Sequence, residues 1–344
     1  MKRKKKQDRN VIHAAYIPER KGPQQQLPYW GESACGRSHC SNAAYYAVGL
    51  IPYCGVHSQP ARKAGTRITL VKNPNAASMA ADELKKHQDG VTQAAAANKA
   101  RGAKGTVETQ KLTMFRVPQL IPNVLNVFPN FNHSKRKDGW GCVRLSPKSL
   151  GPVYHGQPGL PPAKNLENFQ HANKVYFYHH DDGVIHPLFF EMQVAMYQSD
   201  TPYGHQFEFL KAHPQFLPDG CALPTGLKKP DALFSVWITR TNEIKRCGEI
   251  DSRVFYCTAL EILLQKESQW AKLTDMVANG TNVSISGYSA QPLHRSSAGR
   301  YLDARRPFGH EDVIATMLRD PPATWPWRIH ATAVEVPSFL CPSD

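Results

Sequence analysis

The sequence predicts an α+β fold, and three observations support this prediction. The clearest helical segment is residues 252–280, where apolar residues recur every three or four positions and Asn279-Gly280 supplies a stop signal. Residues 232–241 have strand composition, and after a turn at Thr241-Asn242 we expect a return strand around 244–249. Between and around these segments lie further helical stretches and a short strand, so we expect helices around a small mixed sheet.

The other expected elements follow in chain order. The pattern of residues 165–178 predicts a helix whose last residues are aromatic, and the pattern of residues 187–200 predicts a second helix. Residues 282–290 predict a short strand that ends at a glycine. Residues 307–320 start with Pro and Gly and then continue as a helix.

Length and composition bound the class of protein. The chain has 344 residues, of which 41% are hydrophobic, so it is long enough for one large domain or two moderate ones with a folded core. No apolar run is long enough to span a bilayer. The first ten residues, MKRKKKQDRN, lack the apolar core of a secretory signal, so we expect an intracellular protein that is not secreted.

The positive charge is concentrated in the first third of the chain. Residues 1–115 contain 19 Lys/Arg and 7 Asp/Glu, a net charge of +12, whereas residues 116–344 contain 23 and 21, a net charge of +2. A basic segment beside a nearly neutral domain suggests nucleic acid or another polyanion as its partner. The alternative is a solubilising basic tail or a nuclear-localisation-like KRKKK cluster.

A cluster of cysteines and histidines predicts a structural zinc site. The expected ligands are Cys35, Cys40, Cys54 and His57, spaced as two close pairs across a short loop-rich segment, and His39 is a rival ligand. Thiolate and imidazole suit zinc, and a segment with so small a core would fold on the metal. The chain has eight cysteines, and without a secretory signal disulfides are not the default. The alternative is a chance cluster of free cysteines.

Composition shifts divide the chain into six expected regions. These are a basic arm (1–30), a Cys/His zinc-binding module (31–58), an Ala/Lys/Gly-rich linker with at most a short helix (59–110), a Pro-rich docked connector without regular elements (111–163), the α+β domain (164–330) and a tail (331–344).

The helix expected at 165–178 carries one polar face. It places Glu167, Gln170, His171 and Lys174 together, a carboxylate, an amide, an imidazole and an ammonium that could bind a polar ligand and supply an acid or base. The alternative is an exposed face with an ordinary side-chain pair, worth a few tenths of a kcal/mol.

Two more stretches carry candidate ligand-binding residues. In RRPFGHEDV, Gly309 precedes a helix with Arg305 and Arg306 upstream, so backbone N–H groups there can face an anion, and His310 and Glu311 add titratable groups. In SISGYSA, a strand ends at a glycine next to Tyr288, and loops at strand ends often hold ligands. The alternatives are a capped helix start and a plain turn. No Walker loop, Rossmann fingerprint, HExxH motif or nucleophile elbow is present, which excludes the common nucleotide hydrolases and serine hydrolases.

Residues 145–327 resemble a protein family that is widespread in giant DNA viruses. The similar segments are SPKSLGPVYHGQPGLPPAKNLENFQHANKVY, SRVFYC, the strand–Gly–Tyr stretch, RPFGHEDVIATML and WPW. Those viral proteins are in turn similar to the NADAR (YbiA-like) fold, whose members are N-glycosidases acting on ADP-ribosyl or related ribosyl-phosphate compounds. The NADAR hallmark is a helix with Glu, then Gln four residues on, then Lys seven on. Glu167 and Lys174 match it, whereas His171 occupies the middle position and Gln170 lies one place early. The Cys/His segment resembles the short repeats of brown-algal and giant algal-virus proteins.

The resemblance implies cleavage of a ribose C1–N bond through an oxocarbenium-like state. Glu167 would stabilise that charge or activate water, and Lys174 would hold a phosphate or position Glu167, with His171 as the third catalytic candidate. The implied ligand-binding residues are Gln170, Tyr288, Arg305, Arg306, Gly309 and His310, with Tyr288 packing on a ring and Trp270 either a second such residue or part of the core.

Two functions follow from these features. The first is an ADP-ribose-related N-glycosidase, or a protein that binds such ligands, joined to a basic module with structural zinc. The second is a non-catalytic virion or nucleoprotein component that binds nucleic acid or neighbouring proteins through residues 1–115, located in the virion or in the host nucleus or cytoplasm.

Overall fold

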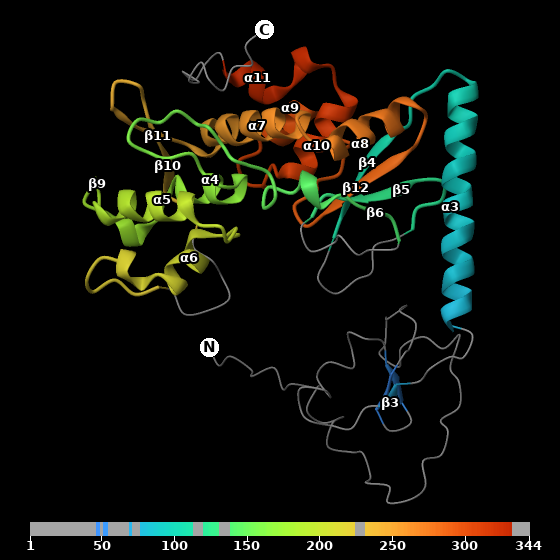
Figure 1. The fold of residues 1–344 in the computed structure, drawn as a ribbon, viewed down its shortest axis with the longest axis horizontal. Helices are drawn as coiled ribbons and strands as arrows, with labels where there is room; N and C mark the ends of the chain where they lie inside the picture. Colours follow the sequence, from blue (N-terminus) through green and yellow to red (C-terminus); the bar gives the residue numbers. More distant parts are fainter. Residues whose placement is uncertain are drawn as a thin grey trace, which may run out of the picture. The chain divides into compact units, whose positions relative to one another are not determined.

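The computed structural model describes residues 46–48, 51–53, 69–70, 76–112, 120–130, 138–223 and 231–331 (Figure 1). The chain divides into two units, Met1–Lys86 and His87–Asp344, and each is described by itself. In the first unit, the described strands form an antiparallel sheet in the order β2-β1-β3, with Tyr46 opposite Tyr53. These strands are β1 (Tyr46–Val48), β2 (Ile51–Tyr53) and β3 (Thr69–Leu70).

The second unit contains a parallel four-stranded sheet in the order β4-β12-β5-β6. All five residues of β12 are buried, as expected for an inner strand of a parallel sheet covered on both faces. Helix α10 contacts β4 and β12. The strands are β4 (Val107–Lys111), β5 (Leu125–Phe128), β6 (Trp140–Gly141) and β12 (Val283–Gly287).

A second, antiparallel sheet has the order β11-β10-β7. Strands β10 (Phe234–Ile238) and β11 (Ile244–Cys247) form the hairpin that the sequence predicted, which is confirmed. Its turn places Asn242 at φ 61°, a left-handed conformation that asparagine tolerates well. Strand β7 (Lys174–Val175) pairs with the other edge of β10. Strands β8 (His180–Asp181) and β9 (Val184–Ile185) form a small separate hairpin.

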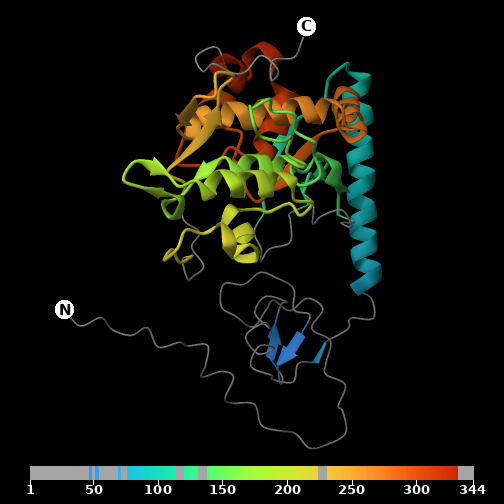
Figure 2. The ribbon, with the colours of Figure 1, turned by 60° about the vertical axis from the view of Figure 1, so that its left-hand side comes forward.

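Helix α7 is the central element of this unit, and it contacts α4, α10, α11 and β10. Figure 1 shows the β10–β11 hairpin and the four-stranded sheet toward opposite ends of α7, and Figure 2 shows the same helices from a second side. Trp237 of β10 stacks on Phe255 of α7, with ring centroids 4.2 Å apart. The helices are α3 (Ala76–Ala100), α4 (Leu166–Ala172), α5 (Leu188–Gln198), α6 (Gln206–Ala212), α7 (Glu249–Gln265), α8 (Ser268–Ala278), α9 (Ser297–Tyr301), α10 (His310–Arg319) and α11 (Pro326–Ala331). Short 3-10 turns are η2 (Val143–Leu145), η3 (Phe177–His179), η4 (Pro214–Phe216) and η5 (Pro322–Thr324).

The helix expected at 165–178 is shorter than predicted. It begins where the side chain of Asn165 accepts a hydrogen bond from the N–H of Asn168 at 2.8 Å, and it ends at Ala172. Asn173 then stops it, because its side-chain amide donates back to the Phe169 carbonyl while its oxygen accepts from two residues of α5, Gln193 and Tyr197. Lys174 therefore lies on strand β7 rather than on the helix.

The helix expected at 252–280 is two helices, α7 and α8. The break comes at Glu267, which has an extended backbone and whose carboxylate pairs with Arg144 at 3.1 Å. Periodicity alone did not reveal this break, because apolar spacing continues across it.

The region expected to be a linker contains regular structure. Residues 59–110 include the 25-residue helix α3 and most of strand β4, and the connector expected at 111–163 includes strands β5 and β6 of the same sheet. Alanine-rich and Pro-punctuated composition concealed these elements. Strands β4 and β5 pair with β12, which lies more than a hundred residues further along the chain. The described residues therefore form a mixed structure of helices and small sheets that starts well before residue 164.

Candidate functional site

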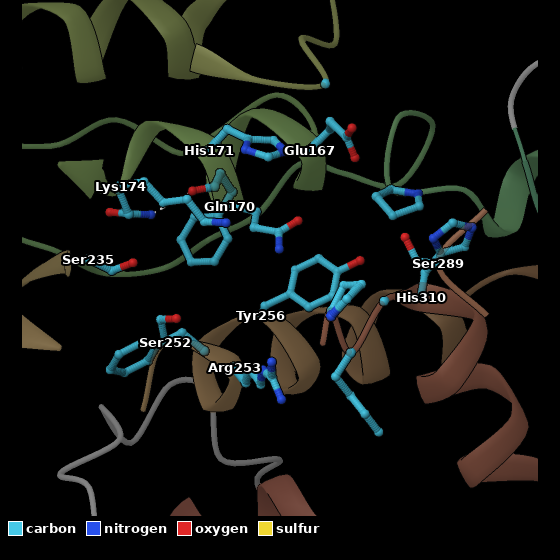
Figure 3. A pocket seen from close by; sticks show the side chains of 18 of the residues that line it. Glu167, Gln170, His171, Lys174, Ser235, Ser252, Arg253, Tyr256, Ser289 and His310 are labelled. Atoms are coloured by element: carbon cyan, nitrogen blue, oxygen red, sulfur yellow. Dashed lines mark hydrogen bonds between the residues drawn. The ribbon is translucent and has the colours of Figure 1, made fainter. Parts of the chain in front are cut away.

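A cavity of about 460 Å³ lies in the second unit, where the ends of several elements meet (Figure 3). This volume suits a ligand of the size of a nucleotide or dinucleotide fragment. Seven of the nine residues expected to be catalytic or ligand-binding line it, namely Glu167, Gln170, His171, Lys174, Tyr288, Gly309 and His310. The structure thus brings together residues that lie up to 143 positions apart in the sequence.

Glu167 lies in the first turn of α4 and faces the cavity. Burial raises the pKa of Glu167 above its ordinary value, while the nearby charges of Lys148 and His310 act in the opposite direction. Gly204 faces the same carboxylate: a Cβ built there would lie 3.4 Å from Glu167 Oε1 and 3.6 Å from Lys148 Nζ. The group is therefore a partly desolvated carboxylate beside cations, which can accept or donate a proton.

Gln170 and His171 both line the cavity, although they are neighbours in sequence. Positions three and four residues after Glu167 flank the same face of a helix, so a shift of one position does not remove the amide from this face. Figure 3 shows Gln170 directed into the cavity between α4 and Tyr256. The exchange of amide and imidazole relative to the NADAR hallmark thus leaves both groups at the site.

Lys174 reaches the cavity from strand β7. Its backbone carbonyl accepts a hydrogen bond of 2.9 Å from the buried side chain of Gln206, which fixes this part of the chain. Burial lowers the pKa of Lys174, and the carboxylates of Glu249 and Glu167 partly offset that effect. Its ammonium makes no ion pair within 4 Å among the described residues, although the carboxylates of Glu249 and Glu167 act on it.

Arg305 and Arg306 do not line the cavity, so the expectation that they bind the anionic end of a ligand is not met by this geometry. Their side chains are largely exposed and lie beside Asp303, at 3.2 Å for Arg305 and 3.9 Å for Arg306. Hydrogen bonds from Arg295 and Arg305 lower the pKa of Asp303 to about 2. The guanidinium groups of Arg305 and Arg306 thus pair with Asp303 at the surface and do not face the cavity.

Arg253 reaches the cavity from the second turn of α7. It is buried, and it donates to the Glu249 carboxylate and to the backbone carbonyls of Tyr301, Asp303 and Arg306. It therefore fastens the loop that leads to Gly309. In the sequence, Arg253 precedes a run of apolar residues in a predicted helix. An arginine in such a position is often buried, and its guanidinium then needs hydrogen-bond partners.

The start of α10 contributes Gly309, His310 and Glu311 to the cavity. Glu311 is 1% exposed, and its carboxylate packs so closely on strand β12 that a Cβ on Gly287 would lie 1.7 Å from Oε1. A Cβ on Gly309 would lie 2.9 Å from Oε2. This carboxylate occupies the positive end of the helix, where the sequence predicted an anion-binding turn, so an anionic ligand group would meet repulsion there.

Several lining residues were not singled out from the sequence. They are Lys148 from the Pro-rich segment, Ser235 from β10, Glu249, Ser252, Arg253 and Tyr256 from α7, and Ser289 after β12. Burial raises the pKa of Tyr256 well above its usual range, and Glu167 and Glu311 act in the same direction. Trp270, the alternative stacking residue, lies in the core instead and is 8% exposed.

The expected zinc ligands Cys35, Cys40, Cys54 and His57, and the rival His39, lie outside the described residues, so the zinc site stays a prediction. Within the described ranges, no group of three or more His, Cys, Asp or Glu side chains is arranged to hold a metal ion. The helices of those ranges include none with the length and apolar character needed to cross a membrane.

Comparison with known proteins found no match to any family model, curated protein or solved structure. The resemblance to the giant-virus family and to NADAR proteins therefore rests on the sequence motifs quoted above.

Proposed function

We propose that this protein binds an ADP-ribosyl or related ribosyl-phosphate compound in the cavity and hydrolyses its ribose C1–N bond. The observation that carries the proposal is the convergence of Glu167, Gln170, His171 and Lys174 with Tyr288 and His310 on one cavity of about 460 Å³. On this proposal the chain is a hydrolase related to NADAR proteins, as the sequence motifs suggest.

The roles follow from the charges around the cavity. Breaking the C1–N bond develops positive charge on the sugar, and the Glu167 carboxylate can stabilise that charge or accept a proton from the attacking water. Lys174, and Lys148 beside Glu167, supply the positive charge that a ligand phosphate needs. The exposed ring of Tyr288 at the rim offers an apolar surface for a base.

The test is hydrolysis of an ADP-ribosylated guanosine by the wild type and by Glu167→Gln, measured as free ADP-ribose. We expect the variant to be slower by about 10²-fold or more, because the amide cannot accept the proton. Glu191→Gln is the matched control, because Glu191 is an exposed carboxylate in the first turn of α5 and does not line the cavity.

A wild-type rate in Glu167→Gln would contradict the assigned role. No release of ADP-ribose by the wild type would favour the second function, a non-catalytic component that binds nucleic acid or neighbouring proteins. The observation that supports this alternative is the net charge of +12 on residues 1–115.

A further inference from the structure

The distance between Glu167 and Lys174 is not set by a helix in this structure. A continuous helix through residue 174 would place both side chains on one face, but helix α4 ends at Ala172. Lys174 lies on strand β7, and its side chain nevertheless lines the cavity together with Glu167 (Figure 3). A contact from another element must therefore fix the backbone from which the Lys174 side chain extends.

Gln206, the first residue of α6, makes this contact. Its side chain is 0% exposed and does not line the cavity. Its Nε2 donates to the Lys174 carbonyl at 2.9 Å and lies 3.4 Å from the His171 carbonyl, while its Oε1 accepts from the Tyr178 hydroxyl at 3.1 Å. Because a carbonyl oxygen can only accept, the orientation of the amide follows from these partners. Gln206 thus bridges the end of α4 and the start of β7.

The sheet does not replace this bridge. The N–H groups of β10 and of the preceding residue, Leu233, donate to the carbonyls of Asn173 and Val175, each at 2.8 Å. The Lys174 carbonyl lies between those two, and its hydrogen bond comes from Gln206 instead. Leaving a partly buried carbonyl without its donor costs free energy. Without the amide, the backbone at Lys174 would therefore turn toward another donor, and the side chain would turn with it.

We propose that Gln206 is the positioning residue for Lys174: its buried amide holds the start of β7 so that the Lys174 ammonium meets a phosphate of the ligand in the cavity. This inference rests on the proposed function, in which Lys174 holds that phosphate. A lysine ammonium sits on a flexible four-carbon stem, so a fixed starting point reduces the positions that it samples before binding. Gln206 lies outside the cavity, and its effect on the ligand must pass through Lys174.

The experiment measures binding of ADP-ribose by calorimetry to the wild type, Lys174→Met, Gln206→Met and the double variant. We expect Lys174→Met to weaken binding by about 10-fold or more. Gln206→Met should weaken it by about 3- to 10-fold, because the ammonium is displaced but still present. Since Gln206 acts through Lys174, the double variant should bind no more weakly than Lys174→Met alone. Additive losses would overturn the positioning role.

Gln157→Met is the matched control. Gln157 is also a buried glutamine, 3% exposed, and its Oε1 accepts from the Ile238 N–H at 3.0 Å. Neither Gln157 nor any of its side-chain partners lines the cavity. We expect this variant to lower the melting temperature, as Gln206→Met does, and to leave ADP-ribose binding unchanged. Equal weakening of binding by both glutamine variants would show a general loss of stability and would contradict the proposal.

Gln206→Glu is a second variant, for the case that Gln206→Met does not fold. It keeps the length of the side chain and the acceptor for the Tyr178 hydroxyl, and it loses the N–H that the Lys174 carbonyl accepts. We expect it to weaken ADP-ribose binding in the same range, and again not beyond the loss in Lys174→Met. Wild-type affinity in a folded Gln206→Glu would overturn the positioning role.

A further readout needs no ligand. The titration of the Lys174 ammonium, followed by ¹³C NMR of lysine side chains and assigned with Lys174→Met, should move in Gln206→Met and stay unchanged in the control variant. The reason is that a displaced ammonium changes its distances to Glu249, Glu167 and Arg253, whose charges act on it. An unmoved titration overturns the positioning role while leaving the proposed function intact. Absence of ADP-ribose binding by the wild type overturns the proposed function and the phosphate contact of Lys174, whatever the titration shows.

Discussion

At the scale of single residues, the cavity holds charged groups that lower the free energy of unfolding. Glu167 is the clearest example, because burial raises its pKa above the ordinary value of 4.5. A carboxyl with a raised pKa binds its proton more tightly in the folded state than in the unfolded state. The free energy of unfolding therefore decreases as pH rises from the unfolded pKa through the folded pKa, and the ionised group lowers stability at neutral pH.

This predicts that Glu167→Gln raises the melting temperature at pH 7 and has little effect near pH 3, where both states of the wild type are almost fully protonated. Thermal melts of both proteins across this range measure the difference. Asp303→Asn is a control of opposite sign, because hydrogen bonds from Arg295 and Arg305 lower the pKa of Asp303 to about 2. The stability that Asp303 contributes is complete above its unfolded pKa and is lost as pH falls through about 2, so this variant should lower the melting temperature at pH 7. A destabilised Glu167→Gln at pH 7 would show that the carboxylate is structural.

At the scale of elements, the site depends on how closely α10 approaches the end of β12. Gly287 makes that approach possible, since any side chain there would overlap the Glu311 carboxylate. The segment from the end of α9 at Tyr301 to Gly309, which precedes α10, is held by hydrogen bonds from the buried Arg253. The position of His310 and Glu311 thus depends on a strand, a helix and a loop from three parts of the chain.

We predict that Gly287→Ala lowers the free energy of unfolding by about 1–3 kcal/mol, because its Cβ would lie 1.7 Å from Glu311 Oε1. Adding Glu311→Ala removes the clash, so the double variant should be more stable than the sum of the two single effects predicts, by about 1 kcal/mol. Urea unfolding of the four proteins measures this coupling. Gly204→Ala is the control, with an expected change within about 0.5 kcal/mol, because its Cβ would meet Glu167 Oε1 at an ordinary 3.4 Å. Strict additivity of the first pair would refute the proposed contact.

At the scale of the whole molecule, the second unit is not confined to the domain expected at 164–330. Strand β12 pairs with β4 on one side and β5 on the other, and both partners precede residue 164. The core includes Val127, Leu145 and Leu150 from the same earlier segment. Helix α3 is also tied to this unit, because Asn98 donates to the Gly280 carbonyl at 2.8 Å.

We therefore predict that a fragment of residues 76–344 unfolds cooperatively in urea, whereas a fragment of residues 164–344 does not. The shorter fragment leaves both edges of β12 unpaired, and unpaired buried backbone groups are costly. Circular dichroism during urea titration distinguishes the two outcomes. A cooperative transition of the 164–344 fragment, with the midpoint of the longer one, would contradict the role of β4 and β5.

Local patterns in the sequence were enough to predict several features of this protein. The polar face of α4, the β10–β11 hairpin, the start of α10 at Gly309 and the uneven charge all follow from residues a few positions apart. The tertiary structure alone decided that Arg253 rather than Arg305 or Arg306 reaches the cavity, that Glu311 takes the helix end expected to bind an anion, and that β4 and β5 complete the sheet. The reason is physical: periodicity records which face of an element is buried, whereas packing between distant elements decides which polar side chains share that buried space.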